Sequence, residues 1–572
     1  MANIRIQNHK NTNRPLPSIS DVRDYLEVVK SHGDKVAFRY LEKKEIIDVT
    51  YAEFVDRVMS LSAGIEAHGL AGKRIAVIGE TSVEWFATYL AVLATAGVVI
   101  PMDKELAISE ISAFLDSVDA DAIVYSKTFN ESFSPYINEK KYRTYVPMVA
   151  EEGEGRENVI PLSTLMGSGK DKVASGYELP KTKRYDELAE MLFTSGTTGT
   201  SKCVMLCQRN IFSVVAAAVN TVPFEKTDTI VSVLPVHHTY ELACTLAGMY
   251  IGMEIAINDS LRYVIRNFAL FKPTGLVLVP LFVNTINKKI WSEAQKQGKT
   301  KLLKNAINIS EGLRAIGIDM RKKLFASVTS SFGGRLEKII CGGAKLNPEL
   351  IETFEAFGIS IYEGFGITEC APLTAVTPYY ARKLGSIGTC VPCCRMRVES
   401  NGQTTEDGYE LGEIQVKGHN VMMGYYNNPD ANAEVFTDDG WFRTGDIGYV
   451  DADGYYYITG RSKFVIVLEN GKNVFPEEIE EYLSNIEGVA ENVVLGRKAE
   501  NSDEVILTAI IYPDSSVYTN GETTEDIQKD LTAKVNNLNK TLPSFKQIKK
   551  VELRETEFVK TTSKKIRRNL VQ

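Results

Sequence analysis

The hydrophobic positions of the chain alternate between short β-rich runs and stretches with helical spacing. The runs RIAVIGE, GVVIPMD and DAIVYS lie between residues 74 and 126, and TIVSVLPV, MEIAIN and GLVLVP lie between residues 229 and 280. Strands separated by helices are typical of parallel sheets with helices packed on their faces. The pattern therefore predicts an α/β fold whose large N-terminal domain, residues 1–460, contains two parallel-sheet modules.

Three later segments depart from this alternation. Residues 283–332, approximately, are helical in period and rich in lysine, which predicts a helical insertion before the strand EKIICGG. Short strands and turns rich in Gly and Asp predict a small β-subdomain over about residues 385–460. A compact α+β pattern follows, with helices expected from Pro476 to Ile486 and from Thr524 to Leu542. We expect residues 461–572 to form a small, mobile C-terminal domain.

Composition and charge narrow the classes of function. The chain has 572 residues, of which 44% are hydrophobic, so it can bury large cores. A net charge of −8 argues against nucleic-acid binding, which normally needs a positive field. The polar N-terminus lacks the apolar segment of a secretory signal, so we expect a cytoplasmic protein. Eight scattered cysteines indicate reduced thiols in place of a disulfide framework.

The lysines of the insertion and one cysteine cluster permit more than one interpretation. The lysines indicate either attachment to an anionic membrane surface, at the inner face of the membrane, or a solvated helix face. The charge pattern alone favours the solvated helix face. Cys390, Cys393 and Cys394 have the spacing of half a zinc site. No second cysteine pair or suitably spaced histidine follows, so we assign no metal ligand there.

The segment LFTSGTTGTSK, residues 192–202, predicts a phosphate-binding loop. Gly196 and Gly199 let backbone N–H groups turn toward an anion, and Lys202 adds a positive charge. Ser201 stands where the common kinase-type loop requires a glycine before its lysine, so a different nucleotide-binding fold is indicated. Hydroxyl donors for the phosphates are Thr194, Ser195, Thr197 and Thr198.

Three further clusters carry groups suited to the rest of a nucleotide. YEGFGITE, residues 362–369, combines an aromatic ring, two glycines, a hydroxyl and a carboxylate, which suits adenine and Mg²⁺. WFRTGD, residues 441–446, ends in a carboxylate that can accept hydrogen bonds from ribose hydroxyls, and Arg461 follows it. KTTSKKIR, residues 560–567, concentrates cations that suit an anion clamp or a solvated tail.

Taken together, these clusters resemble the adenylate-forming enzymes, the superfamily of acyl-CoA synthetases, luciferases and nonribosomal-peptide adenylation domains. The resemblance extends from about Tyr51 to Arg568. It implies that a carboxylate attacks the α-phosphate of Mg-ATP to give an acyl-adenylate and pyrophosphate, after which a thiol displaces AMP. The residues suit this reaction because phosphoryl chemistry depends on positioning and on neutralisation of charge.

The resemblance also implies roles in binding Mg-ATP. Residues 194–202 would hold the β- and γ-phosphates, Glu369 would bind Mg²⁺, and Thr368 would reach the α-phosphate. Asp446 and Arg461 would bind the ribose. The positions implied to flank adenine, within 343–345 and 362–366, are Gly343, Ala344, Tyr362, Gly364 and Gly366.

Within the C-terminal domain, the resemblance implies that Lys565 is the catalytic lysine that bridges the carboxylate and ATP. The resemblance also implies that Lys463 occupies the position of the hinge, about which this domain would rotate after adenylation. A thiol channel would follow near residues 469–473, where Gly471 permits close approach of a pantetheine arm; an ordinary Asn-Gly hairpin turn is the alternative.

The chain departs from the family pattern at three positions. Lys564 replaces the glycine that usually precedes the catalytic lysine, which leaves two adjacent lysines for one role, although position favours Lys565. Ser201 and Cys203 stand where proline and glycine are usual. These departures keep open a non-catalytic sensor that binds nucleotide or acyl ligand.

The segment LPVHHTYE, residues 234–241, bears on the acid that is activated. It resembles the fatty-acyl members, in which His238 would stand beside the substrate carboxylate; a packing role at a helix start is the alternative. No aspartate occurs between Leu234 and Gly248 to meet a substrate ammonium, which disfavours amino acids. The insertion after Phe282 also resembles the long-chain branch. We therefore expect a medium- or long-chain fatty acid.

The acceptor is expected to come from outside the chain. The sequence ends shortly after Lys565, and no carrier domain or carrier serine motif follows it. Coenzyme A and acyl carrier protein present the same pantetheine thiol. We expect coenzyme A, with acyl carrier protein or another carboxylate–CoA ligase activity as alternatives.

Overall fold

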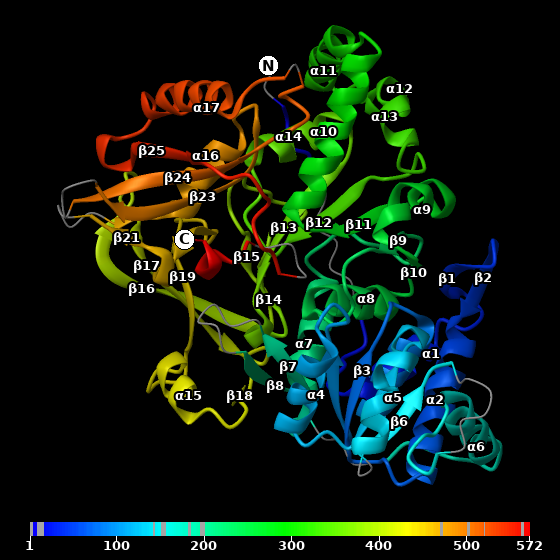
Figure 1. The fold of residues 1–572 in the computed structure, drawn as a ribbon. Coiled ribbons are helices and arrows are strands. Elements are labelled where there is room, and N and C mark those ends of the chain that lie inside the picture. Colours follow the sequence, from blue (N-terminus) through cyan, green and yellow to red (C-terminus); the bar gives the residue numbers. More distant parts are fainter. Residues whose placement is uncertain are drawn as a thin grey trace. The chain divides into compact units, whose positions relative to one another are not determined.

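The computed structural model describes residues 4–8, 16–140, 143–149, 156–180, 185–194, 201–468, 473–499, 504–519, 521–561 and 566–571. They form two compact units, which are drawn in Figure 1 and described separately below. The first unit falls within residues 1–194, 201–395 and 416–440, and the second within residues 396–415 and 441–572.

A seven-stranded sheet forms the first half of the first unit. Its order is β18-β8-β7-β4-β3-β5-β6, and the strands from β7 to β6 are parallel. At the other end, β8 and β18 add two antiparallel strands. The bounds are β3 Arg74–Ile78, β4 Val98–Met102, β5 Ala122–Tyr125, β6 Thr144–Pro147, β7 Leu188–Thr194, β8 Lys202–Cys207 and β18 Gly424–Tyr425.

Helices accompany this sheet as the alternation predicts. All residues of the helix α3 except Glu84 are buried, and the strand β4 that follows it is buried throughout. The longest apolar stretch of the sequence, from Trp85 to Met102, therefore forms a core helix and strand. The helices of this half are α2 Tyr51–Ala67, α3 Val83–Ala94, α4 Ile108–Ser117, α5 Asn130–Glu139 and α6 Leu162–Ala174.

A nine-stranded sheet forms the second half of the first unit, in the order β15-β14-β13-β12-β11-β9-β10-β1-β2. Its six inner strands, β13 to β1, are parallel, and antiparallel strands close both ends. The bounds are β1 Val36–Glu42, β2 Glu45–Thr50, β9 Thr229–Ser232, β10 Glu254–Ile257, β11 Gly275–Leu278, β12 Lys338–Gly342, β13 Ser360–Gly366, β14 Leu373–Val376 and β15 Thr389–Cys390.

The helices of this half fall into two groups. One group accompanies the strands: α1 Val22–Lys30, α7 Gln208–Ala218, α8 Thr239–Ile251, α9 Val264–Phe271 and α14 Pro348–Ala356. The other lies in sequence between β11 and β12, where the insertion was expected: α10 Pro280–Lys296, α11 Thr300–Ala315, α12 Arg321–Leu324 and α13 Ala326–Ser330. A short helix, α15 Pro429–Val435, follows β18.

The described part of the second unit contains three small sheets and two α-helices. A four-stranded sheet has the order β16-β17-β19-β20, a two-stranded ribbon pairs β21 with β22, and a three-stranded sheet has the order β23-β24-β25. The bounds are β16 Cys394–Thr404, β17 Glu410–Gly418, β19 Phe442–Val450, β20 Tyr456–Arg461, β21 Ile466–Val467, β22 Asn473–Val474, β23 Val489–Lys498, β24 Val505–Pro513, β25 Ile548–Leu553, α16 Pro476–Ser484 and α17 Thr524–Asn539.

The predicted α/β class is confirmed. Both parallel-sheet modules are present in the large N-terminal part, and the C-terminal part is a smaller α+β structure. Each large sheet is mixed, because antiparallel strands extend its parallel core.

Candidate functional site

The nine-stranded sheet brings several predicted site residues to one edge. His238 follows β9, Gly343 and Ala344 follow β12, and Thr368 and Glu369 follow β13. Because β9, β12 and β13 run parallel, their carboxyl ends meet at the same edge of the sheet. Ligands of open α/β sheets bind at this edge. The topology thus gathers groups that are more than a hundred residues apart in the sequence.

The hairpin of β7 and β8 positions the two ends of the phosphate loop. Thr194 is the last residue of β7, Lys202 is the first of β8, and the two are paired across the hairpin. The Thr194 hydroxyl donates a hydrogen bond of 3.2 Å to the Lys202 carbonyl oxygen. Residues 195–200, which include Ser195, Gly196, Thr197, Thr198 and Gly199, lie outside the described residues.

A short chain of contacts joins Lys202 to Glu369. The Lys202 ammonium lies 4.8 Å from the centre of the Tyr425 ring, and the Tyr425 hydroxyl donates a hydrogen bond of 2.8 Å to Glu369 Oε1. Burial, followed by the charge of Glu369, raises the pKa of Tyr425, so its hydroxyl stays protonated as a donor. The ring thus fixes the cation at the end of the phosphate loop relative to the carboxylate expected to bind Mg²⁺.

Tyr425 was not among the residues predicted from the sequence. It lies in β18, whose two residues pair with Val204 and Met205 of β8. The backbone N–H of Met422 also donates to the Glu369 carbonyl oxygen at 2.8 Å. A Gly-Tyr pair more than fifty residues beyond Glu369 gives no local sign of this role, because only the pairing of strands places it there.

The structure places the expected adenine residues in different surroundings. Gly343 and Ala344 are exposed in the turn after β12, where a ligand can reach them, and Gly343 has a φ of 86°. Gly366 must lack a side chain, since a Cβ would lie 2.4 Å from the Pro372 carbonyl oxygen. Gly364 is half-buried in β13.

The Tyr362 ring is fully buried in the main hydrophobic core of the first unit. The guanidinium carbon of Arg382 lies 5.2 Å from the centre of this ring. Burial raises the pKa of Tyr362 to about 12. In this structure, therefore, the side chain packs in the core and is not presented at the sheet edge.

His238 caps the start of α8 and is half-buried. Its ring lies 4.3 Å from the ring of His237. His237 is buried, and burial lowers its pKa well below the usual value. His237 Nε2 is 3.6 Å from Asp103 Oδ2, which is too long for a hydrogen bond, so we treat His237 as neutral. His238 is the more accessible of the two imidazoles.

In the second unit, Asp446 and Arg461 face each other on adjacent antiparallel strands. They are direct partners in the pairing of β19 with β20, and Arg461 Nε lies 2.9 Å from Asp446 Oδ1. Asp446 is buried, and its backbone N–H donates to the Thr444 hydroxyl at 3.0 Å. The sheet therefore presents a carboxylate, which can accept hydrogen bonds from hydroxyl groups, beside a guanidinium, which can donate to hydroxyl or phosphate oxygens.

The segments predicted to contain the hinge and the catalytic lysine are also in the second unit. The Lys463 ammonium lies 5.0 Å from the centre of the Phe464 ring, and the guanidinium carbon of Arg568 lies 4.9 Å from the same ring. Arg568 also pairs with Glu480, whose pKa burial raises to about 7. Lys560 and Ile566 form an antiparallel bridge. Lys564, Lys565 and Gly471 lie outside the described residues.

The cysteine cluster is a set of thiols. Cys390 Sγ lies 3.6 Å from Cys394 Sγ, and Cys394 Sγ also contacts the Thr374 carbonyl oxygen at 3.5 Å. Within the described ranges, no group of three or more His, Cys, Asp or Glu side chains is arranged to hold a metal ion.

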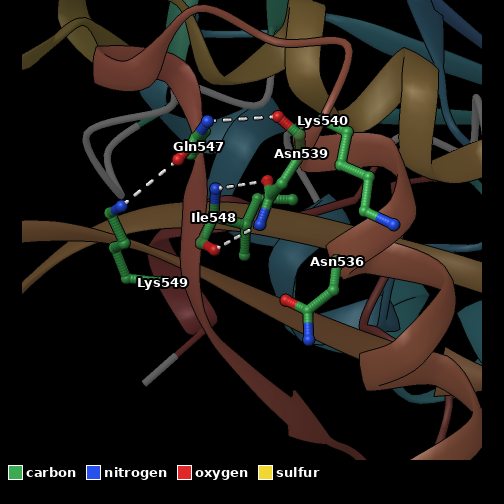
Figure 2. A pocket seen from close by; sticks show the side chains of 6 residues that line it. All are labelled: Asn536, Asn539, Lys540, Gln547, Ile548 and Lys549. Atoms are coloured by element: carbon green, nitrogen blue, oxygen red, sulfur yellow. Dashed lines mark hydrogen bonds between the residues drawn. The ribbon is translucent and has the colours of Figure 1, made fainter.

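A surface pocket of about 380 Å³ lies in the second unit, between the end of α17 and the start of β25. Figure 2 shows hydrogen bonds from Lys549 to Gln547, from Gln547 to the backbone of Asn539, and between Asn539 and the backbone of Ile548. Asn539 exchanges hydrogen bonds of 2.8 and 2.9 Å with the backbone of Ile548, and Gln547 Nε2 donates to the Asn539 carbonyl oxygen at 3.2 Å. These contacts fasten α17 to β25, and we assign the pocket no part in the reaction.

Comparison with protein families agrees with this geometry. Residues 26–426 match the family described as AMP-binding enzyme, and residues 463–572 match the AMP-binding enzyme C-terminal domain. The chain therefore belongs to the AMP-binding, or adenylate-forming, enzymes. The resemblance inferred from the four sequence clusters is confirmed.

Individual relatives include ligases with two kinds of acceptor. The chain is 28% identical over 483 residues to a long-chain-fatty-acid–CoA ligase, FadD15, of Mycobacterium bovis, covering 81% of this chain and 78% of that protein. It is 26% identical over 553 residues to the chloroplastic long-chain-fatty-acid–[acyl-carrier-protein] ligase AEE15 of Arabidopsis thaliana, covering 85% and 75%. The fold is similar to that of ATP-bound MatB from Rhodopseudomonas palustris, with a TM-score of 0.71, 23% identity and coverage of 96% and 98%.

Proposed function

We propose that this enzyme activates a medium- or long-chain fatty acid with ATP and transfers the acyl group to coenzyme A, releasing AMP and pyrophosphate. The observation that carries the proposal is the arrangement of Lys202, Tyr425 and Glu369 beside the carboxyl-end edge of the nine-stranded sheet. It combines a cation and a carboxylate at the ends of two predicted nucleotide motifs. This pairing suits a nucleoside triphosphate carried with a divalent cation.

In the first step, a carboxylate oxygen of the acid attacks the α-phosphorus of ATP, and the bond to pyrophosphate breaks. Lys202 and the hydroxyls of residues 194–198 hold the β- and γ-phosphates, and Thr368 contacts the α-phosphate. Lys565 offsets the negative charges of the carboxylate and the phosphate as they approach. Asp446 and Arg461 bind the ribose hydroxyls.

Glu369 is suited to Mg²⁺. This ion is usually held by one or two carboxylates together with substrate phosphates and water, and Glu369 supplies one carboxylate on a half-buried turn. The hydrogen bond from Tyr425 orients that carboxylate through Oε1. When bound, Mg²⁺ neutralises phosphate charge.

In the second step, the thiol sulfur attacks the acyl carbon and AMP leaves. We assign the change between the steps to rotation of the C-terminal domain, residues 461–572, about Lys463, with Gly471 in the thiol channel. Lys564, in place of the usual glycine, adds a second positive charge beside Lys565.

The choice of acid is supported by two features of the chain. His238 is half-exposed at the start of α8, on the same sheet edge as Glu369, where it can meet a substrate carboxylate. The segment from Leu234 to Gly248 contains no aspartate to bind an ammonium group. Relatives named for long-chain fatty acids strengthen the proposal.

The acceptor is tested by supplying ATP, Mg²⁺ and palmitate with either coenzyme A or pantetheinylated acyl carrier protein, and by measuring the mass of the thioester. We expect palmitoyl-CoA to form faster than the carrier-protein thioester. A product formed only on the carrier protein would contradict coenzyme A as the acceptor. It would indicate an acyl-carrier-protein ligase, the activity for which the Arabidopsis relative is named. Acyl-adenylate without either thioester would contradict the second step.

A further inference from the structure

The helical insertion between β11 and β12 concentrates positive charge. Residues 283–332 contain ten Lys and Arg against three Asp and Glu, a net charge of +7 in a chain whose net charge is −8. The two arginines turn inward, where Arg314 pairs with Glu311 at 2.6 Å and Arg321 pairs with Glu355 at 3.0 Å. The side chains left at the surface are lysines: Lys288, Lys289, Lys296, Lys299, Lys301, Lys304, Lys322 and Lys323.

The helix α11 has an inner face that is already packed. Leu303, Ala306 and Ile307 join a small core with Phe325 and Trp291. Ser310 and Glu311, one turn further along, are also buried. This face therefore accounts for the folding of α11 against its neighbours, and the helix needs no other apolar residues for that purpose.

A second apolar stripe lies on the outside of α11. Leu302, Ile309 and Ile316 are 64%, 59% and 72% exposed. They are spaced by seven residues, which is nearly two helical turns, so Leu302 and Ile309 line up along one side of α11, and Ile316, the residue directly after the helix, continues that line. Ile318 and Leu324, just beyond, are 46% and 38% exposed. We call Leu302, Ile309, Ile316 and Ile318 the outer stripe.

The position of α11 leaves this stripe accessible. The helix lies at the upper end of the first unit in Figure 1, with α12 and α13 beside it. Lysines flank the stripe in sequence at both ends: Lys299, Lys301 and Lys304 surround Leu302, and Lys322 and Lys323 follow Ile318. The surface thus combines aligned aliphatic side chains with exposed ammonium groups.

We propose that the outer stripe and its lysines bind the surface of an anionic lipid bilayer. Aliphatic side chains on one side of a helix enter the boundary between headgroups and acyl chains, while lysines reach the lipid phosphates. The positive charge of this surface favours an anionic bilayer over a symmetric dimer. In such a dimer the same positive surface of a second copy would face it, and the two would repel each other. Contact is at the surface, since in the described part of the chain no helix is long and apolar enough to cross a membrane.

The consequence for catalysis rests on the proposed function. Long-chain fatty acids partition into bilayers, so an enzyme held at the surface meets its substrate where that substrate is concentrated. Binding to lipid does not depend on this consequence, because it requires only α11 and the neighbouring lysines. The two proposals can therefore fail independently.

The test is flotation of the full-length protein with phosphatidylcholine vesicles, with and without added phosphatidylglycerol, in the absence of ATP and acid. We expect binding to the anionic vesicles that weakens as salt rises. The triple variant Leu302→Ser, Ile309→Ser and Ile316→Ser should lower the partition coefficient at least roughly tenfold, since each side chain loses its apolar insertion. Lys301→Glu with Lys304→Glu should do the same for anionic vesicles.

Matched variants at other surfaces provide the control. Ile46→Ser with Val149→Ser removes side chains that are 46% and 53% exposed, and Lys43→Glu with Lys44→Glu reverses two exposed charges on the turn after β1. These should bind as the unaltered protein does. Thermal unfolding of each variant and its pyrophosphate release without vesicles check that the fold is retained.

Three outcomes would overturn the proposal. The unaltered protein would remain with the unbound fraction, or it would bind neutral and anionic vesicles equally, or the control variants would lose as much binding as the stripe variants. Loss of a dimer in the triple variant, measured by sedimentation without lipid, would assign the stripe to self-association instead.

Discussion

Lys565→Ala should abolish adenylation and spare the second half-reaction. Without this cation, the substrate carboxylate and the α-phosphate approach with their charges unopposed, and removal of one preorganised charge of this kind costs roughly 100- to 1,000-fold in rate. Acid-dependent exchange of pyrophosphate into ATP measures the loss. The same variant, supplied with synthetic acyl-adenylate and coenzyme A, should form thioester at nearly the normal rate.

Lys564→Ala is the matched control, because it removes the adjacent positive charge one position away. It should retain most of the adenylation activity. The assignment is wrong if Lys564→Ala loses adenylation while Lys565→Ala keeps it, or if Lys565→Ala loses only the thioester step.

Glu369→Gln should lower ATP turnover at least roughly 100-fold and raise the Mg²⁺ concentration needed for half-maximal rate. The amide has nearly the same shape and can still accept the Tyr425 hydrogen bond, but it lacks the negative charge that attracts Mg²⁺. Initial rates measured over a Mg²⁺ titration at saturating ATP separate the two effects.

Tyr425→Phe tests how much the orientation of the Glu369 carboxylate contributes, apart from its charge. This variant removes the hydrogen bond to Glu369 and leaves the charge and the ring beside Lys202 in place. We expect a loss of roughly tenfold, at the low end of what one hydrogen bond to a charged group contributes. For the Glu369→Gln variant, a Mg²⁺ dependence equal to that of the unaltered enzyme would show that Glu369 does not bind Mg²⁺.

Hydrophobic pattern predicted the elements well where local signals are strong. The strands β3 and β4 lie wholly within the predicted runs RIAVIGE and GVVIPMD. The helix α17 starts where expected, since Thr523 and Asp526 form a capping box. It ends at Asn539, before the predicted end at Leu542. The sequence marks the end of this helix only by Pro543, because no glycine follows its last turn.

Contacts between segments that lie far apart in the chain could not be predicted from the sequence. The role of Tyr425 depends on the pairing of β18 with β8, which no local pattern indicates. The burial of Tyr362 likewise follows from the layers packed on β13. The motifs themselves could be assigned because glycines, hydroxyls and charges occur within a few residues of each other, as in 192–202 and 441–446.

The outer stripe shows the same limit for surfaces. From the sequence, the charge pattern of this lysine-rich helical segment favours an ordinary solvated face, and no local signal separates its apolar residues into buried and exposed ones. The structure divides those residues between two sides of α11, with Leu303 and Ile307 inside and Leu302 and Ile309 outside. Which side packs is decided by neighbouring helices, and so the exposed set emerges only in three dimensions.

Release of pyrophosphate from ATP in the presence of Mg²⁺, measured against acids from acetate to oleate with benzoate and amino acids alongside, tests the central claim most directly. We predict turnover that peaks at a medium- or long-chain fatty acid, increases with coenzyme A and disappears without the acid. A maximum at an amino acid or at benzoate, or no release with any acid in the panel, would contradict the account.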